Sequence, residues 1–141
     1  MRFRPINQKD KKAVWRLEQQ LFPKPYNQNQ IRLAIRAFAG FVAKDNQKII
    51  GYLIFAEKQD HFFIRRIGVA KEFQGQGVAQ KLVQKMFERA RKKKIKIILL
   101  RVRQDNQRAM GFYKKVGFEI RKRLKNYYGK NKDGLEMIKM L

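Results

Sequence analysis

The sequence predicts an α/β fold: a mixed central sheet of about seven strands with helices on both faces. Two observations lead to this prediction. Strand-like segments alternate with segments of helical spacing along the chain. One strand-like segment, residues 48–57, is apolar at both alternating positions, which is typical of a strand covered on both faces. With 141 residues and no repeat or linker-like stretch, we expect a single domain over residues 1–141.

The N-terminal part is expected to hold one short strand and two helices. Residues 2–6 form the strand. Asn7 and Asp10 have the spacing of a capping box, which opens a helix with apolar residues on one face. A Phe-Pro-Lys-Pro stretch ends this helix. Asn27 caps the second helix, and Gly40 is expected to end it.

The remaining elements follow from changes in the hydrophobic period. Apolar residues recur at every second position in a strand and at every third or fourth position in a helix. On this basis the sequence predicts strands at 41–44, 48–57, 61–69, 95–103, 118–125 and 135–141, a long helix from Val78, and a short helix between Asn106 and Gly117.

Charge and composition limit the classes of function. Lys and Arg number 35 and Asp and Glu number 11, a formal net charge of +24, which attracts anions and disfavours small cationic substrates. The excess predicts docking on ribosomal RNA or an acidic protein, although a lysine-rich compositional bias would produce the same charge. The absence of cysteine excludes thiolate catalysis and Cys-based metal sites, and we expect no metal. No long apolar run predicts a membrane span, so we expect a cytoplasmic protein.

A glycine-rich turn lies between a predicted strand and the long helix, in the order Gln74-Gly75-Gln76-Gly77-Val78-Ala79. Glycine lets the backbone approach a ligand closely. The unpaired N–H groups of a first helical turn bind anions. The turn therefore suits a pyrophosphate, although a loop leading into a helix would also explain Gly-x-Gly. No Gly-Lys-Ser/Thr follows, so it is not a P-loop.

Two segments together resemble the GNAT superfamily of acetyl-CoA-dependent N-acetyltransferases. The first, residues 69–79, is similar to motif A of that family, Gln/Arg-x-x-Gly-x-Gly/Ala. The second is similar to motif B and has Asn106, Ala109, Tyr113, Gly117 and Phe118 at the family's spacing. The motifs stand in the family's order, and the resemblance spans nearly the whole chain. Softer signals at residues 18–23, 100–103 and 125–128 resemble the RimI-like subgroup, which acetylates N-terminal amines.

The resemblance implies a site for acetyl-CoA. By family analogy the backbone of one strand end would hydrogen-bond the pantetheine arm, through Ile67, Gly68 and Val69. The pyrophosphate would lie on Gln74, Gly75, Gln76, Gly77, Val78 and Ala79. Asn106 would contact the cofactor near its thiol end. Ordinary sheet pairing would also account for Ile67 and Val69.

The resemblance also implies a general acid and an acceptor groove. Tyr113 would protonate the departing CoA thiolate, although helical spacing alone would place it in the core beside Phe112. General acid catalysis typically contributes about 10²–10⁴-fold. Tyr127 and Tyr128, in the loop before the last strand, would line the acceptor groove or simply close a hairpin.

The usual general base is missing from this sequence. RimI-like enzymes have a glutamate or histidine where this chain has Arg101, and a guanidinium cannot accept a proton. Replacement candidates, acting through a water, are Glu57, His61, Glu119 and, more weakly, Glu18. Arg101 itself would hold an acidic acceptor side chain or the acceptor backbone, or pair with a carboxylate such as Glu119.

The missing base favours an N-terminal acceptor. At pH 7 the neutral form of an α-amine, with a pKa of about 7.7–8.0, costs only about 1–1.4 kcal/mol, whereas that of lysine costs about 4.6 kcal/mol. The sequence therefore predicts an acetyltransferase for protein N-terminal α-amines that acts by direct attack, as a monomer or a homodimer. The alternatives are a lysine or small-amine acetyltransferase, or a GNAT-fold protein with weakened chemistry that binds RNA or an acidic partner.

Overall fold

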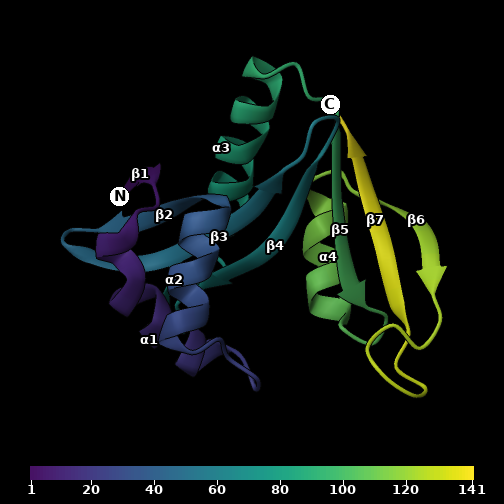
Figure 1. The fold of residues 1–141 in the computed structure, drawn as a ribbon, viewed down its shortest axis with the longest axis horizontal. Coiled ribbons are helices and arrows are strands. Elements are labelled where there is room, and N and C mark those ends of the chain that lie inside the picture. The colour runs from purple at the N-terminus through teal and green to yellow at the C-terminus, as the bar shows by residue number, and fades with distance from the viewer.

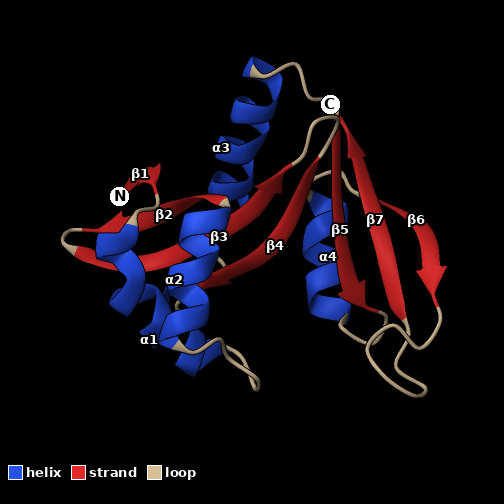
Figure 2. Ribbon diagram, viewed as in Figure 1, coloured by secondary structure: helices blue, strands red, loops and turns tan.

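A computed structural model describes residues 1–141 as one seven-stranded mixed sheet with helices on both faces (Figures 1 and 2). The strand order is β1-β2-β3-β4-β5-β7-β6. The predicted fold class is confirmed. The strands are β1 (Arg2–Pro5), β2 (Ala39–Asp45), β3 (Lys48–Glu57), β4 (Phe62–Val69), β5 (Ile97–Arg103), β6 (Glu119–Leu124) and β7 (Gly134–Met140). The helices are α1 (Lys11–Leu21), α2 (Gln28–Ala37), α3 (Val78–Lys92) and α4 (Gln107–Lys115), with 3₁₀ turns at Gln8–Asp10 and Lys71–Phe73.

Two helical layers sandwich the sheet. Helices α1 and α2 lie on one face and α3 and α4 on the other (Figure 1). Neighbouring residues of β3 show why both of its faces are apolar: Gly51 lies against Val78 and Leu82 of α3, whereas Tyr52 reaches Glu18 of α1. The interior of β3 is buried throughout. None of the helices combines the length and apolar content that a membrane crossing requires.

The sheet opens between its two halves. Strands β4 and β5 are parallel neighbours, but they pair only at Phe62 with Ile98 and at Phe63 with Leu99. Beyond these pairs the two strands diverge, as Figure 1 shows. On its other side β5 pairs with β7 along its whole length. The divergence leaves the C-terminal ends of β4 and β5 free of each other, and the candidate site lies at this opening.

Two predicted boundaries differ from the structure by two residues or more. Gly40 was expected to end a helix, but α2 ends at Ala37 and Gly40 lies inside β2. A Cβ at Gly40 would lie 2.5 Å from the carbonyl oxygen of Leu53, so glycine is needed for close strand contact and not as a helix stop. The strand expected from residue 95 begins at Ile97, because the Ile95 N–H still bonds the Ala90 carbonyl at the end of α3.

Candidate active site

The glycine-rich turn forms the entry to α3 as the sequence predicts. Gly75 and Gly77 both have a φ of +81°, in the left-handed region that favours glycine. A Cβ at either position would meet no atom within 4 Å, so the turn presents bare backbone to an open space. Gly77 is the N-cap residue of α3 and provides no side-chain cap. The first N–H groups of this 15-residue helix are therefore free to bind an anion.

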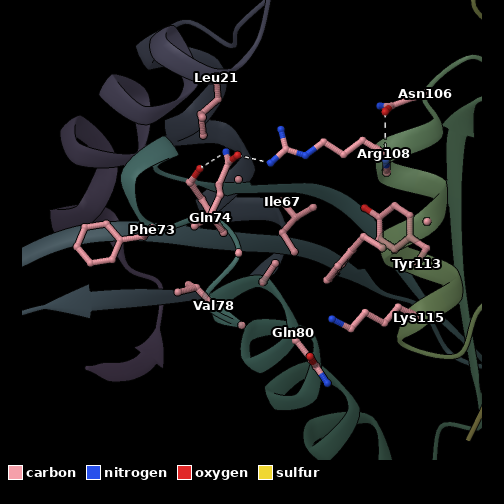
Figure 3. A pocket seen from close by; sticks show the side chains of 18 of the residues that line it. Leu21, Ile67, Phe73, Gln74, Val78, Gln80, Asn106, Arg108, Tyr113 and Lys115 are labelled. Atoms are coloured by element: carbon pink, nitrogen blue, oxygen red, sulfur yellow. Dashed lines mark hydrogen bonds between the residues drawn. The ribbon is translucent and has the colours of Figure 1, made fainter.

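A pocket of about 560 Å³ lies between this turn, the end of β4 and helix α4 (Figure 3). Nearly all the residues proposed for the cofactor line it; Gln76 is the exception, since its side chain donates to the Glu72 carbonyl instead. The lining residues from the predicted set are Ile67, Gly68, Val69, Gln74, Gly75, Gly77, Val78, Ala79, Asn106 and Tyr113. The pocket has the size of a typical small-molecule site and contains several apolar side chains.

Two cations that the sequence patterns did not point to also line this pocket, Arg108 and Lys115. Arg108, in the first turn of α4, donates a hydrogen bond to the side-chain oxygen of Gln74. The Gln74 amide nitrogen in turn donates to the Val69 carbonyl at 2.9 Å. These contacts connect α4 to the glycine-rich turn and place a guanidinium beside it (Figure 3). No spacing rule signals such a pair, because its members are 34 positions apart.

Two residues of motif B serve both the fold and the pocket. Asn106 caps α4, since its side-chain oxygen accepts from the Ala109 N–H at 3.1 Å. Tyr113 is 7% exposed, and its ring packs edge-on against Phe112 and Phe118. Its hydroxyl makes no hydrogen bond to the protein, is open to the pocket, and points across it toward Ile67 (Figure 3). Burial, with a smaller effect of the Tyr128 phenol, raises the pKa of Tyr113 above its usual value, so the hydroxyl keeps its proton.

Arg101 lies on the other side of the opening. On β5 the buried neighbours Leu100 and Val102 face the layer of α4, so Arg101 points to the opposite face of the sheet. Its Nε donates to the Glu136 carboxylate at 3.3 Å and its Nη1 to the Tyr127 hydroxyl at 2.9 Å. Of the three roles considered for Arg101, the structure shows a carboxylate pairing, but with Glu136 of the adjacent strand and not with Glu119.

The two loop tyrosines lie together at this opening. The rings of Tyr127 and Tyr128 contact each other edge to face, with centroids 4.9 Å apart. Both side chains remain partly exposed. Tyr127 reaches Arg101, and Tyr128 lies close enough to Tyr113 to affect its pKa. The loop therefore joins the Arg101 side of the sheet to the Tyr113 side.

None of the candidate bases lines the pocket. Glu57 binds Arg89 and Lys93 of the α3 end, and the Arg89 hydrogen bond lowers its pKa. His61 bonds its neighbour Asp60 in the turn before β4. Glu119 is exposed on the edge strand β6, two strands and about 10 Å away from β5.

Glu18, the weakest candidate base, is fully buried and fully engaged. Its carboxylate accepts two hydrogen bonds from Arg66, at 2.7 Å each, one from the Tyr52 hydroxyl and one from the Tyr26 N–H at 2.9 Å. The Arg66 guanidinium is itself stacked between the rings of Phe22 and Tyr26. This arrangement anchors the segment after α1 to β4. It leaves the carboxylate no free position for an incoming proton.

Comparison with known proteins agrees with this geometry. Residues 11–118 match the model of the Acetyltransferase (GNAT) family. The chain is 32% identical to N-alpha-acetyltransferase 30 of Schizosaccharomyces pombe, over 95% of this chain and 94% of that protein. It is also 32% identical to the [ribosomal protein bS18]-alanine N-acetyltransferase of Haemophilus influenzae, over 65% of this chain and 62% of that protein.

Solved structures share the fold. The ribosomal-protein-S18-alanine N-acetyltransferase of Escherichia coli superposes with a TM-score of 0.90 at 21% identity, covering 99% of this chain and 92% of that one. The pocket, the motifs and these matches define an acyl-transferring enzyme. The chain belongs to the GNAT family of N-acetyltransferases, and the RimI-like resemblance seen in the sequence is confirmed.

Proposed function

We propose that this enzyme transfers acetyl from acetyl-CoA to the N-terminal α-amine of a protein by direct attack. The observation that carries the proposal is that the two carboxylates near the opening are both already bound by cationic side chains. Glu18 is saturated by Arg66, Tyr52 and a backbone N–H, and Glu136 is held by Arg101 and Arg121. Without a free carboxylate, the acceptor has to supply its own neutral amine. An α-amine does so at about 1–1.4 kcal/mol at pH 7, and a lysine at about 4.6 kcal/mol.

The pocket fits acetyl-CoA at the positions where the cofactor's chemistry requires contacts. The free N–H groups at Gly77 and the start of α3 suit the pyrophosphate, and Arg108 adds a cation beside them. The end of β4 lies unpaired on the β5 side, so the Ile67–Val69 backbone can bond the pantetheine arm. Bound there, acetyl-CoA supplies the activated acetyl group.

The protein's own groups would then act from both sides of the opening. Tyr113 holds its proton on the pocket side and would donate it to the departing thiolate, and the proton that the amine loses as the amide forms would return to Tyr113 through solvent. On the other face the acceptor amine would enter between β4 and β5, beside Arg101 and the Tyr127–Tyr128 loop. Nearby positive charge lowers the pKa of an amine. The cationic surroundings therefore favour the neutral form of the acceptor amine, which reduces the need for a general base.

The names of two of the relatives agree with this acceptor class. The fission yeast relative is an N-alpha-acetyltransferase, and the Haemophilus relative acts on the alanine of ribosomal protein bS18. The first name denotes acetylation of an α-amine, and the second names a protein as the acceptor. A ribosomal or other acidic docking partner would account for the +24 charge, which exceeds what one cofactor needs.

A paired peptide assay tests the proposal. One set of peptides carries a free α-amine and no lysine, and the other has a blocked N-terminus and one internal lysine. We expect acetyl transfer to the free α-amine to exceed transfer to lysine by at least tenfold in kcat/KM at pH 7. Equal rates, or a preference for lysine, would overturn the proposal.

A further inference from the structure

Arg101 occupies the point where β4 and β5 separate. It lies two residues beyond Leu99, which forms the last pair with β4. Its guanidinium carbon is 5.3 Å from the ring centroids of both Phe63 and Tyr127. These aromatic contacts and the bond to the Tyr127 hydroxyl hold the flexible side chain in one place. A long, cationic side chain is thus positioned at the mouth through which an acceptor would enter.

The Arg101 guanidinium has N–H donors that no group of the protein uses. A guanidinium has five N–H donors. Two are used inside the protein, by Glu136 at 3.3 Å and by the Tyr127 hydroxyl at 2.9 Å. The side chain is 37% exposed. Its remaining three donors include both N–H groups of Nη2, which suit a carboxylate.

The local charge is not balanced. Glu136 has one negative charge but faces three cations, with Arg121 at 3.0 Å, Arg101 at 3.3 Å and Lys122 at 3.9 Å. Arg121 makes the shortest of these contacts, so Arg101 is not the sole partner of Glu136. The other buried acid near the opening, Glu18, is paired with Arg66. A net positive charge therefore remains at Arg101.

We infer that Arg101 makes this enzyme select acceptors with a carboxylate side chain, Asp or Glu, at the first or second residue. The inference rests on the proposed function. The limit to the first two residues assumes that the amine enters where the strands separate: the opening begins at Leu99, and Arg101 stands two strand positions beyond it, about 7 Å. A carboxylate that reaches Arg101 thus belongs to a residue at or next to the reacting amine. The same charge repels basic acceptors, which gives discrimination in both directions.

Matched peptides test the inference. Peptides with Asp or Glu at position 1, 2 or 3 are compared with otherwise identical Asn or Gln peptides. With the acidic residue at position 1 or 2, we expect kcat/KM to be roughly 10–100-fold higher than for the amide peptide, mainly through a lower KM. A hydrogen bond to a charged group strengthens binding by about this factor. At position 3 the ratio is expected to fall toward one.

Substitutions assign the effect to Arg101. Arg101→Gln should reduce the acid-to-amide ratio to within about twofold of one. Arg103→Gln is the matched control, because Arg103 lies on the same strand and the same face but pairs with Asp105, and it should keep the ratio. Arg101→Glu would face Glu136, so the double variant Arg101→Glu/Glu136→Gln is used to avoid two adjacent carboxylates. That variant should prefer peptides with Lys at position 2. Thermal unfolding of each variant confirms that it folds.

The outcomes separate this inference from the function on which it rests. Wild-type enzyme that acetylates acidic and amide peptides equally, or a preference that survives Arg101→Gln, would overturn the inference and leave N-terminal acetylation intact. Acetylation confined to lysine side chains or to free amino acids would overturn the proposed function, and the inference with it.

Discussion

Removing one oxygen atom, in Tyr113→Phe, tests the proton donor of the proposed reaction. The ring is packed edge-on, 5.3 Å from Phe112 and 5.7 Å from Phe118, and phenylalanine preserves both contacts. The hydroxyl makes no hydrogen bond within the protein, so its removal leaves no buried group without a partner. We therefore expect the free energy of unfolding to change by less than about 0.5 kcal/mol.

The expected effect lies in the chemical step. General acid catalysis contributes about 10²–10⁴-fold, or about 2.7–5.4 kcal/mol of barrier. A thiol with a pKa near 8.5 leaves tolerably well without help, so we expect the lower end, about 10²-fold in kcat. The assay measures release of free CoA thiol at saturating acetyl-CoA with an α-amine peptide. Calorimetric titration with CoA should show affinity within about twofold of the wild type.

Tyr52→Phe is the matched control, because Tyr52 is also buried but its hydroxyl bonds Glu18. It should lose about 1–2 kcal/mol of stability and keep kcat within about threefold at a temperature where it is folded. If Tyr113→Phe instead retains kcat within threefold, the thiolate does not receive its proton from Tyr113. A fall in kcat matched by a similar loss of stability would indicate a packing role.

Further predictions concern the pocket, the pH dependence and an ion pair outside the site. Gly77→Val forces a β-branched residue to φ +81°, which should lower the free energy of unfolding by about 1–2 kcal/mol. It should also weaken CoA binding at least tenfold. An unchanged affinity in calorimetric titration would contradict the pyrophosphate role. Because burial raises the pKa of Tyr113, its acid form persists, and the wild-type kcat should show no loss from Tyr113 ionisation up to about pH 10 in a pH–rate profile. Arg89 lowers the pKa of Glu57, so this ion pair stabilises the fold above about pH 4.3 and the stabilisation is lost as pH falls through the lowered value. Urea unfolding of Glu57→Gln should therefore give a free energy of unfolding about 0.5–1 kcal/mol lower at pH 7, and that free energy should fall less at acidic pH, with kcat unchanged. If the stability of the variant depends on pH as that of the wild type does, this prediction is refuted.

The sequence by itself determined most of the elements and the glycine-rich turn at the start of α3. The capping box of Asn7 and Asp10 and the N-cap of Asn106 involve residues at most three positions apart, so short-range spacing predicts them correctly. The glycine turn is similar: Gly75 and Gly77 adopt positive φ because of local backbone geometry. The arginine at position 101, where the resemblance implies a glutamate or histidine, was also visible, because it is a change of one residue in the strand before motif B.

Only the tertiary structure decided how the Arg101 side of the opening is built. Glu136 faces Arg101 because β5 and β7 pair antiparallel in one register, and these residues are 35 positions apart. A one-residue change of register would move Glu136 to the other face of the sheet, and no local pattern specifies it. The same holds for Glu18, whose candidacy as a base ended when β4 brought Arg66 to it across 48 positions. Local spacing encodes short-range contacts, whereas the charge balance at the opening depends on strand pairing and on packing between layers.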